Sequence, residues 1–272
     1  MLPLAAALAL AAGAGAGAEH PAVTTVYPAA QPKGLMVTSA GWPYCVQLRP
    51  LAHRLGYTLL CGRFWKDGYT GLRLRHLRHL DWGNPDYLAD YARQIRAFHA
   101  KVGGKLILIG VSASGFAVAT LAAHHPEIRP DRVIVIDSYL DLVARRRAAT
   151  GVTAHEIDDE TGGSEAELRA RSASAAGLAA LVRQGTKLAV IWSISPGEKR
   201  EFNGATCNRD ANAATLARLA QALQRPVRAW VTGGRHGYDL WNHGQAIVAG
   251  RYPGRQVVFR PDGRIPPGSV CR

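Results

Sequence analysis

Residues 105–119, KLILIGVSASGFAVA, decide how the chain folds. Residues 106–109 form an uninterrupted apolar run, which is typical of a strand buried on both faces. The run then passes through Gly110 and Ser112 into a segment rich in Ala, which favours a helix. We therefore predict a strand, a sharp turn and a helix at this point of the chain.

The turn singles out one serine. A sharp strand-to-helix turn strains the backbone of the residue at its tip, so the residues two positions before and after must be small. Ser112 meets this condition, because Gly110 precedes it and Ser114 follows it. Ser114 does not, because Phe116 stands where a small residue is needed. The pattern indicates a nucleophile at Ser112, beside helix N–H groups that favour developing negative charge. The alternative is that these serines only cap the helix.

Strands and helices alternate along the rest of the chain. Its 272 residues and 47% hydrophobic content fit one large α/β domain. The apolar runs predict six core strands at 34–39, 57–61, 105–111, 132–137, 187–193 and 227–231, with short strands at 22–27 and 256–259. Such alternation implies a mostly parallel, doubly wound sheet with right-handed crossovers. The polar segment 138–186 is too long for a simple crossover, and we predict a helical lid there, with a surface insertion as the alternative.

The amino-terminal stretch predicts export. Residues 1–18 are apolar and rich in Ala and Gly, and they end in Ala16-Gly17-Ala18, a small-x-small cleavage pattern before Glu19. No Lys or Arg precedes the apolar stretch, which departs from an ordinary signal peptide. We expect cleavage after Ala18, a domain at 19–272, and a secreted or periplasmic protein.

The four cysteines are Cys45, Cys61, Cys207 and Cys271, and their wide spacing argues against a zinc site. An even number in an exported chain favours disulfides. We predict Cys45 bonded to Cys61, since both follow consecutive strands, and Cys207 bonded to Cys271. Four buried thiols are the alternative.

The chain is strongly basic, with a formal charge of +13. This charge favours attraction to anionic surfaces, polymers or lipid headgroups. The densest cluster, at residues 73–79, alternates basic residues with Leu. No nucleic-acid-binding module or aromatic stacking platform is visible, so we expect no nucleic-acid partner. A solvated, Arg-rich surface is the plainer account of the charge.

Several polar residues follow strands whose carboxyl ends share one edge of the sheet, where open α/β sheets bind ligands. They include Ser112, Asp137 and His236, together with the turn at 40–42. With its Gly110-to-Ser114 turn and its Gly233-to-Gly237 loop, the chain resembles the α/β-hydrolase family over about residues 34–248. The order of serine, acid and histidine fits that family. Ser114 stands where the family usually has Gly, and the loop at 39–42 lacks the usual His-Gly start.

The resemblance implies a serine hydrolase that cleaves a carboxylic ester, or less readily a thioester or amide, through an acyl-enzyme on Ser112. His236 would take the serine proton, because an alcohol is a poor nucleophile at neutral pH. The N–H groups of Ala113 and of Gly41 or Trp42 would hold the oxyanion. The substrate would be a small or lipid-like ester, with no metal or organic cofactor. A binding protein that has lost the chemistry, and an acyltransferase with the same triad, are the alternatives.

The acid of the triad has three candidates. The resemblance most often places it after the strand 187–193, where Glu198 and Glu201 lie, but the usual Gly-x-x-Asp turn is missing there. A minority of the family carries the acid after the preceding strand, where this chain has Asp137, 137 − 112 = 25 residues beyond Ser112. Asp137 is our first choice, followed by Glu201 and Glu198. An Asp at a strand end can also simply cap the next turn.

Overall fold

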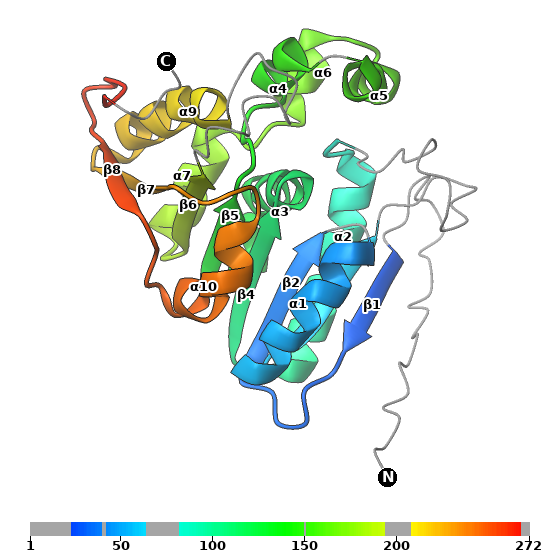
Figure 1. The fold of residues 1–272 in the computed structure, drawn as a ribbon. Helices are drawn as coiled ribbons and strands as arrows, with labels where there is room; N and C mark the ends of the chain where they lie inside the picture. The colour runs from blue at the N-terminus through cyan, green and yellow to red at the C-terminus, as the bar shows by residue number, and fades with distance from the viewer. Residues whose placement is uncertain (1–22, 40–41, 64–81, 150, 194–207, 268–272) are drawn as a thin grey trace.

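The computed structural model describes residues 23–39, 42–63, 82–149, 151–193 and 208–267. They form one eight-stranded sheet in the order β1-β3-β2-β4-β5-β6-β7-β8. The strands are β1 (Val23–Tyr27), β2 (Gly34–Ser39), β3 (Thr58–Arg63), β4 (Lys105–Val111), β5 (Arg132–Ile136), β6 (Lys187–Ser193), β7 (Val227–Thr232) and β8 (Arg255–Phe259). Strands β2 to β7 are parallel, and β1 and β8 pair antiparallel at the two edges (Figure 1). The predicted doubly wound sheet is confirmed.

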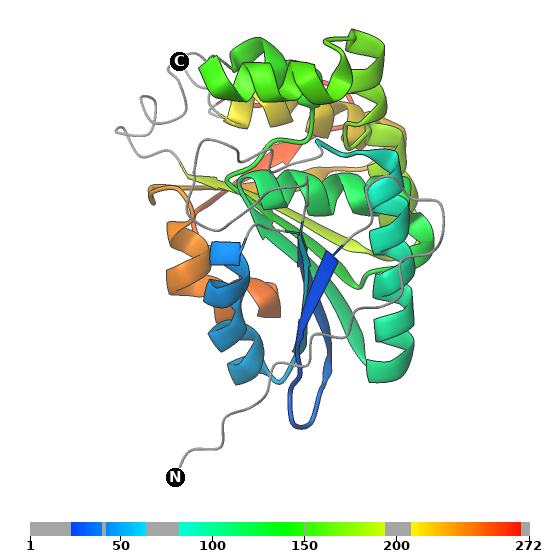
Figure 2. The ribbon, with the colours of Figure 1, turned by 90° about the vertical axis from the view of Figure 1, so that its right-hand side faces the viewer.

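Helices cover both faces of the sheet (Figure 2). One face packs against α1 (Trp42–Leu55) and α10 (Tyr238–Ala249) through a buried apolar cluster that includes Met36, Leu48, Ile109 and Leu240. The other face packs against α2 (Pro85–Val102), α3 (Ala113–His124), α7 (Ala175–Arg183) and α9 (Asn208–Leu223). Such two-sided burial explains why the central strands are apolar throughout.

In the sequence, Asn84 followed by Pro85 predicts the start of a helix, and Gly103-Gly104 predicts its end; α2 has these ends. The side chain of Asn84 accepts hydrogen bonds from the N–H groups of Asp86 (2.9 Å) and Tyr87 (3.5 Å), and so caps α2. Gly103, at φ 68°, ends that helix. The sequence also predicts a helix that starts near Asp210 with this residue as its N-cap, but α9 starts at Asn208, so Asp210 lies in its first turn.

The segment between β5 and β6 differs from the prediction in one respect. The sequence predicts an Ala-rich helix that begins near Ser164, but Ser164 caps only the short α6 (Glu165–Ala170). The Ala-rich helix is α7, which Ser174 caps. Since α7 packs with α3 and α9 on the sheet, it is the crossover helix that the long segment contains. The insertion is therefore limited to α4 (Leu142–Ala148), α5 (Gly151–Thr161) and α6, which lie together above the sheet in Figures 1 and 2.

The insertion is attached to the domain by an aromatic cluster. Trp82, Phe116 and Tyr139 pack with ring centroids 5.1 to 6.4 Å apart, and apolar residues of α4, α5 and α6 complete the cluster. The Arg145 guanidinium lies 5.3 Å from the centre of the Tyr139 ring, within the range of a cation–π contact. Phe116 belongs to the first turn of α3, so the insertion is anchored beside the predicted nucleophile. That it works as a lid stays a prediction.

The predicted disulfide between Cys45 and Cys61 is wrong, because both residues are thiols in the structure. Cys45 lies in the first turn of α1, whereas Cys61 lies inside β3, which continues to Arg63, so the two cysteines do not both follow strand ends as the prediction assumed. Both side chains are completely buried in the apolar cluster under α1, where a thiol packs like a small hydrophobic group. Cys207 and Cys271 lie outside the described residues.

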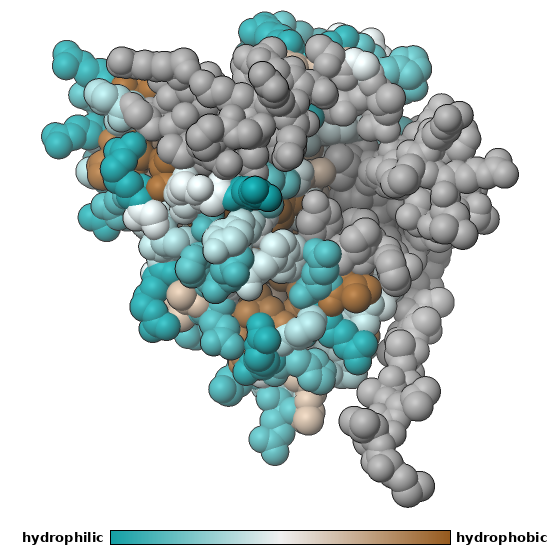
Figure 3. Space-filling model, in the orientation of Figure 1, coloured by the Kyte–Doolittle hydropathy of each residue, from teal (hydrophilic) through white to brown (hydrophobic). Residues whose placement is uncertain are grey.

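The described surface is largely hydrophilic on the face shown in Figure 3, with hydrophobic residues gathered in small areas. Among the described residues, four large hydrophobic ones are exposed, namely Val46, Tyr238, Trp241 and Ile265. None of the helices in the described ranges is both long and apolar enough to cross a membrane. The predicted signal segment and the basic cluster at 73–79 lie outside those ranges.

Candidate active site

Ser112 lies between the last residue of β4 and the first residue of α3, in a strained backbone conformation with φ 55° and ψ −129°. Residues other than Gly seldom adopt a positive φ, and such strain costs about 1–3 kcal/mol. Its N–H donates to the carbonyl of Ile136 at 3.0 Å, which ties the turn to the end of β5. The Ser112 side chain makes no capping hydrogen bond to α3, so helix capping does not account for this serine.

The residues on either side of Ser112 explain how the turn closes. A Cβ on Gly110 would lie 2.3 Å from the carbonyl oxygen of Ser114, which no side chain can tolerate. The Ser114 hydroxyl accepts a hydrogen bond from the N–H of Val111 at 2.8 Å and donates one to the Val111 carbonyl at 2.9 Å. Ser114 therefore fastens the first turn of α3 to the end of β4. The two serines of the motif have different surroundings, as predicted.

Of the three residues predicted to supply oxyanion N–H groups, the structure describes two, Ala113 and Trp42. Ala113 is the first residue of α3 and half-buried, and Trp42 is the first residue of α1. Both helices follow neighbouring parallel strands, β4 and β2, so their amino ends share one edge of the sheet. The amino end of a helix has N–H groups without intrahelical partners, and these favour negative charge. Gly41 lies outside the described residues.

Asp137 follows β5 and is 2% exposed. Its backbone is also in the left-handed region, at φ 47°. One carboxylate oxygen accepts hydrogen bonds from the N–H (2.6 Å) and the hydroxyl (2.8 Å) of Ser193 at the end of β6. The other accepts the N–H of Gly237 at 2.7 Å. The carboxylate thus joins the ends of two strands to the loop that carries His236.

His236 is half-buried in the loop between β7 and α10. The next residue, Gly237, is the N-cap of α10 at φ 72°, and a Cβ on it would lie 3.5 Å from a methyl group of Val111. Since Val111 directly precedes Ser112, the histidine loop packs against the strand end that carries the predicted nucleophile. The structure therefore brings Ser112, Asp137 and His236 to one edge of the sheet. The two other candidate acids, Glu198 and Glu201, lie outside the described residues.

A second buried carboxyl group, Asp239, was not predicted. It is 2% exposed in the first turn of α10 and accepts a hydrogen bond from the Thr232 hydroxyl at 2.6 Å. Burial raises the pKa of Asp239 above its usual value, and the nearby Asp137 carboxylate raises it further, against the Thr232 hydrogen bond and His243. An acid in the first turn of a helix commonly serves only to complement the helix dipole, so the sequence alone does not mark Asp239 as part of the site.

No metal centre is found within the described ranges, where no three His, Cys, Asp or Glu side chains are grouped to hold an ion. Comparison of the sequence with models of protein families finds no match. Comparison with curated proteins finds none either.

Solved structures share the fold. An acylaminoacyl peptidase from Pyrococcus horikoshii superimposes with a TM-score of 0.55 at 13% identity, over 85% of this chain and 38% of that one. A puromycin-hydrolyzing peptidase from Mycobacterium tuberculosis superimposes with a TM-score of 0.51 at 14% identity, over 79% of this chain and 34% of that one. This chain thus spans little more than a third of either peptidase. It has the α/β-hydrolase fold.

Proposed function

We propose that the protein is a serine hydrolase that cleaves carboxylic esters through an acyl-enzyme on Ser112. The observation that carries this proposal is the strained backbone of Ser112 (φ 55°) at the strand-to-helix turn, with a side chain that does not cap α3. Backbone strain at a serine whose side chain does not cap the following helix supports a functional role. The same fold also supports other chemistry, so the site residues, and not the fold, support the proposal.

The proposed reaction has two steps. The Ser112 oxygen attacks the ester carbonyl carbon while His236 takes the hydroxyl proton, and the N–H of Ala113 stabilises the oxyanion. The intermediate collapses, His236 gives the proton to the leaving alcohol, and the acyl group stays on Ser112. A water molecule then attacks the acyl carbon while His236 takes its proton. The second intermediate collapses as His236 returns this proton to the Ser112 oxygen, and the carboxylic acid leaves.

Asp137 is proposed as the acid that orients His236 and stabilises its charged form. The hydrogen bond from Gly237 supports this assignment, because it holds the carboxylate one residue from the histidine. Glu201 and Glu198 are the alternatives. His236→Ala should lower turnover by several orders of magnitude, as removal of a triad base does. A drop of less than tenfold would show that another group acts as the base.

Labelling with a fluorophosphonate probe tests the proposal directly, because the probe reacts with an activated serine. Failure to label the folded protein would favour the binding-protein alternative. Turnover of p-nitrophenyl esters of increasing acyl length would define the acyl pocket. Matched p-nitroanilides test amides, since the two solved structures named above are peptidases, and added acceptor alcohols test acyl transfer.

We also propose that residues 1–18 direct export and are removed after Ala18. This proposal depends on the apolar stretch and its Ala16-Gly17-Ala18 ending. Amino-terminal sequencing of protein recovered from the culture medium or the periplasm should begin at Glu19. Recovery only from the cytoplasm, with the first 18 residues intact, would refute the proposal.

A further inference from the structure

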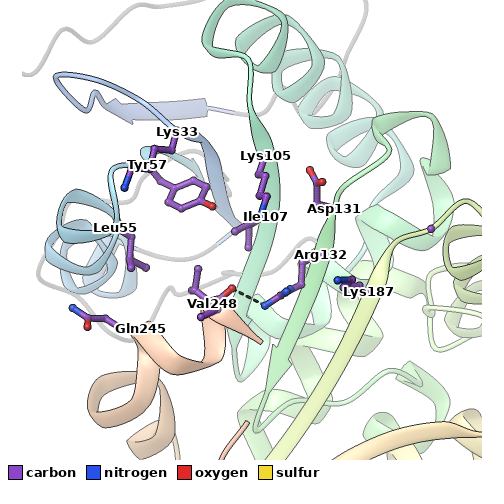
Figure 4. Close-up of a pocket in the computed structure, with 12 residues that line it drawn as sticks. Lys33, Leu55, Tyr57, Lys105, Ile107, Asp131, Arg132, Lys187, Gln245 and Val248 are labelled. Carbon is purple, nitrogen blue, oxygen red and sulfur yellow. Dashed lines mark hydrogen bonds between the residues drawn. The ribbon is translucent and has the colours of Figure 1, made fainter. Parts of the chain in front are cut away.

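A hollow of about 380 Å³ lies at the amino ends of the central strands, on the edge of the sheet opposite Ser112 (Figure 4). Its walls come from the starts of β4, β5 and β6 and from the carboxyl ends of α1 and α10. The volume lies within the range of small-molecule sites, about 300–1,000 Å³. None of the proposed catalytic residues lines it.

Strand register explains why basic side chains meet there. Ile107 of β4 pairs with Arg132 of β5, and Arg132 pairs with Lys187 of β6. Lys105 precedes Ile107 by two residues. Paired residues of parallel strands, and residues two apart on one strand, project from the same face. The three cations therefore project from one face, which is the face that α1 and α10 cover.

The charge of the hollow is strongly positive. Lys33, Lys105, Arg132 and Lys187 line it, against a single carboxylate, Asp131. The described ranges contain no ion pair of the three lysines, whereas other cations of the chain pair with acids, such as Arg146 with Asp158. Crowded like charges repel one another, and an anion would relieve that repulsion.

Two of the charged groups already have partners that hold them in place. The Asp131 carboxylate accepts the N–H of Leu106 at 2.8 Å. The Arg132 guanidinium donates to the carbonyl of Val248 at 2.6 Å, at the carboxyl end of α10 (Figure 4). The lysine ammonium groups are exposed and can therefore turn toward a ligand.

The inner wall of the hollow is apolar, with one hydroxyl. Leu55, Ile107 and Val248 supply hydrocarbon surface, and the Tyr57 ring is 9% exposed with its hydroxyl directed into the hollow (Figure 4). Burial raises the pKa of the Tyr57 phenol, and the Asp131 carboxylate raises it further, with Arg132 acting in the opposite direction. The phenol therefore stays protonated and can donate a hydrogen bond.

We propose that this hollow binds an organic phosphate monoester, with the phosphate among the lysines and its apolar part against Ile107 and Val248. Ammonium groups attract phosphate as point charges, whereas a planar carboxylate favours a free guanidinium, and Arg132 is engaged with α10. A doubly charged group also gains more than a carboxylate from several cations. The monoester is either a soluble compound or the headgroup of phosphatidic acid.

Calorimetric titration of the whole chain with 1-naphthyl phosphate tests the proposal. We expect saturable binding that raises the unfolding temperature, with inorganic phosphate at least tenfold weaker because it lacks the apolar part. Lys105→Gln and Lys187→Gln should each raise the Kd about fivefold or more. The matched control is Lys101→Gln, an equal charge change on α2 that should stay within twofold. Circular dichroism checks that each variant is folded.

One further measurement distinguishes the soluble monoester from the lipid headgroup as the ligand. A second shows whether the ligand binds in this hollow or at the Ser112 site. Binding to vesicles of phosphatidic acid, lost in Lys105→Gln and Lys187→Gln but with no binding of 1-naphthyl phosphate, identifies the lipid headgroup as the ligand. Ser112→Ala should keep the affinity of the wild type, because the two sites lie on opposite edges of the sheet. The proposal would be overturned if the protein bound neither 1-naphthyl phosphate nor the vesicles saturably. It would also be overturned if the control Lys101→Gln weakened binding as much as Lys105→Gln and Lys187→Gln do.

Discussion

The Asp137 carboxylate accepts a hydrogen bond from the N–H of Gly237, 2.7 Å away, although 100 residues separate them. This bond links the end of β5 to the loop that follows β7, across the intervening end of β6. Because Ser193 donates twice to the other carboxylate oxygen, Asp137 is held from both sides. The carboxylate is therefore both a proposed catalytic group and a structural one, and experiments on it must separate the two roles.

Replacing Ser112 should abolish labelling without lowering stability, whereas replacing Ser114 should lower stability without abolishing labelling. Ser112→Ala removes the proposed nucleophile, so we expect no fluorophosphonate labelling and an unfolding temperature close to that of the wild type. Ser114→Ala removes the hydroxyl bonded to Val111 and should cost about 1 kcal/mol of unfolding free energy while labelling persists. Labelling of folded Ser112→Ala would refute the assignment.

Asp137→Asn should lower turnover by about a thousandfold or more, as neutralising the acid of a triad does. It should also destabilise the fold by about 1–3 kcal/mol, because an amide nitrogen would face one of the donors from Ser193 or Gly237. Turnover is therefore measured per folded molecule, after denaturant titration. Asp141→Asn, at the N-cap of α4, is the matched charge control.

A rate of Asp137→Asn near that of the wild type would exclude Asp137 as the acid. A collapse of the rate in Glu201→Gln or Glu198→Gln would then identify the acid in the loop after β6.

Gly110→Ala should prevent the turn from forming. The added methyl group would lie 2.3 Å from a backbone oxygen of Ser114, so α3 would have to move away from β4. We expect a loss of several kcal/mol or no soluble protein, in keeping with severe overpacking in a core. Gly233→Ala is the control, because nothing lies within 4 Å of its added Cβ. Equal unfolding free energies of the two variants would show that the turn is not closely packed.

The parts of the structure that follow local rules were predictable. The apolar run 106–109 predicted β4, and Asn84 with Pro85 predicted the start of α2, because strand burial and helix caps depend on residues close in the sequence. Contacts between residues far apart in the sequence were harder to predict. Cys61 was placed at the carboxyl end of its strand, whereas β3 continues to Arg63, and this misplaced strand end contributed to the wrong disulfide.

At the candidate site, too, features that depend on neighbouring residues were predicted and features that depend on long-range contacts were not. The strain at Ser112 was predicted from its small neighbours, which act within two residues. The buried Asp239 carboxyl beside Asp137 and the basic hollow at the amino edge were not predicted, because both arise from contacts between residues far apart in the sequence. Burial of Asp239 depends on α10 packing against the sheet, and no local pattern encodes that contact.

Asp239 offers a test through pH. Its raised pKa means that the native state holds this proton more tightly than the unfolded chain, whose aspartates titrate near about 3.9. The contribution of Asp239 to the free energy of unfolding is thus fully present below that value and is lost as pH rises through the raised pKa. Asp239→Asn does not titrate and keeps an oxygen that can accept the Thr232 hydroxyl. Relative to the wild type, this variant should therefore gain stability from about pH 4 upward, measured by denaturant unfolding at each pH. Asp262→Asn, at an exposed position, controls for the change in net charge, and a difference from the wild type that stays constant with pH for Asp239→Asn would contradict the raised pKa.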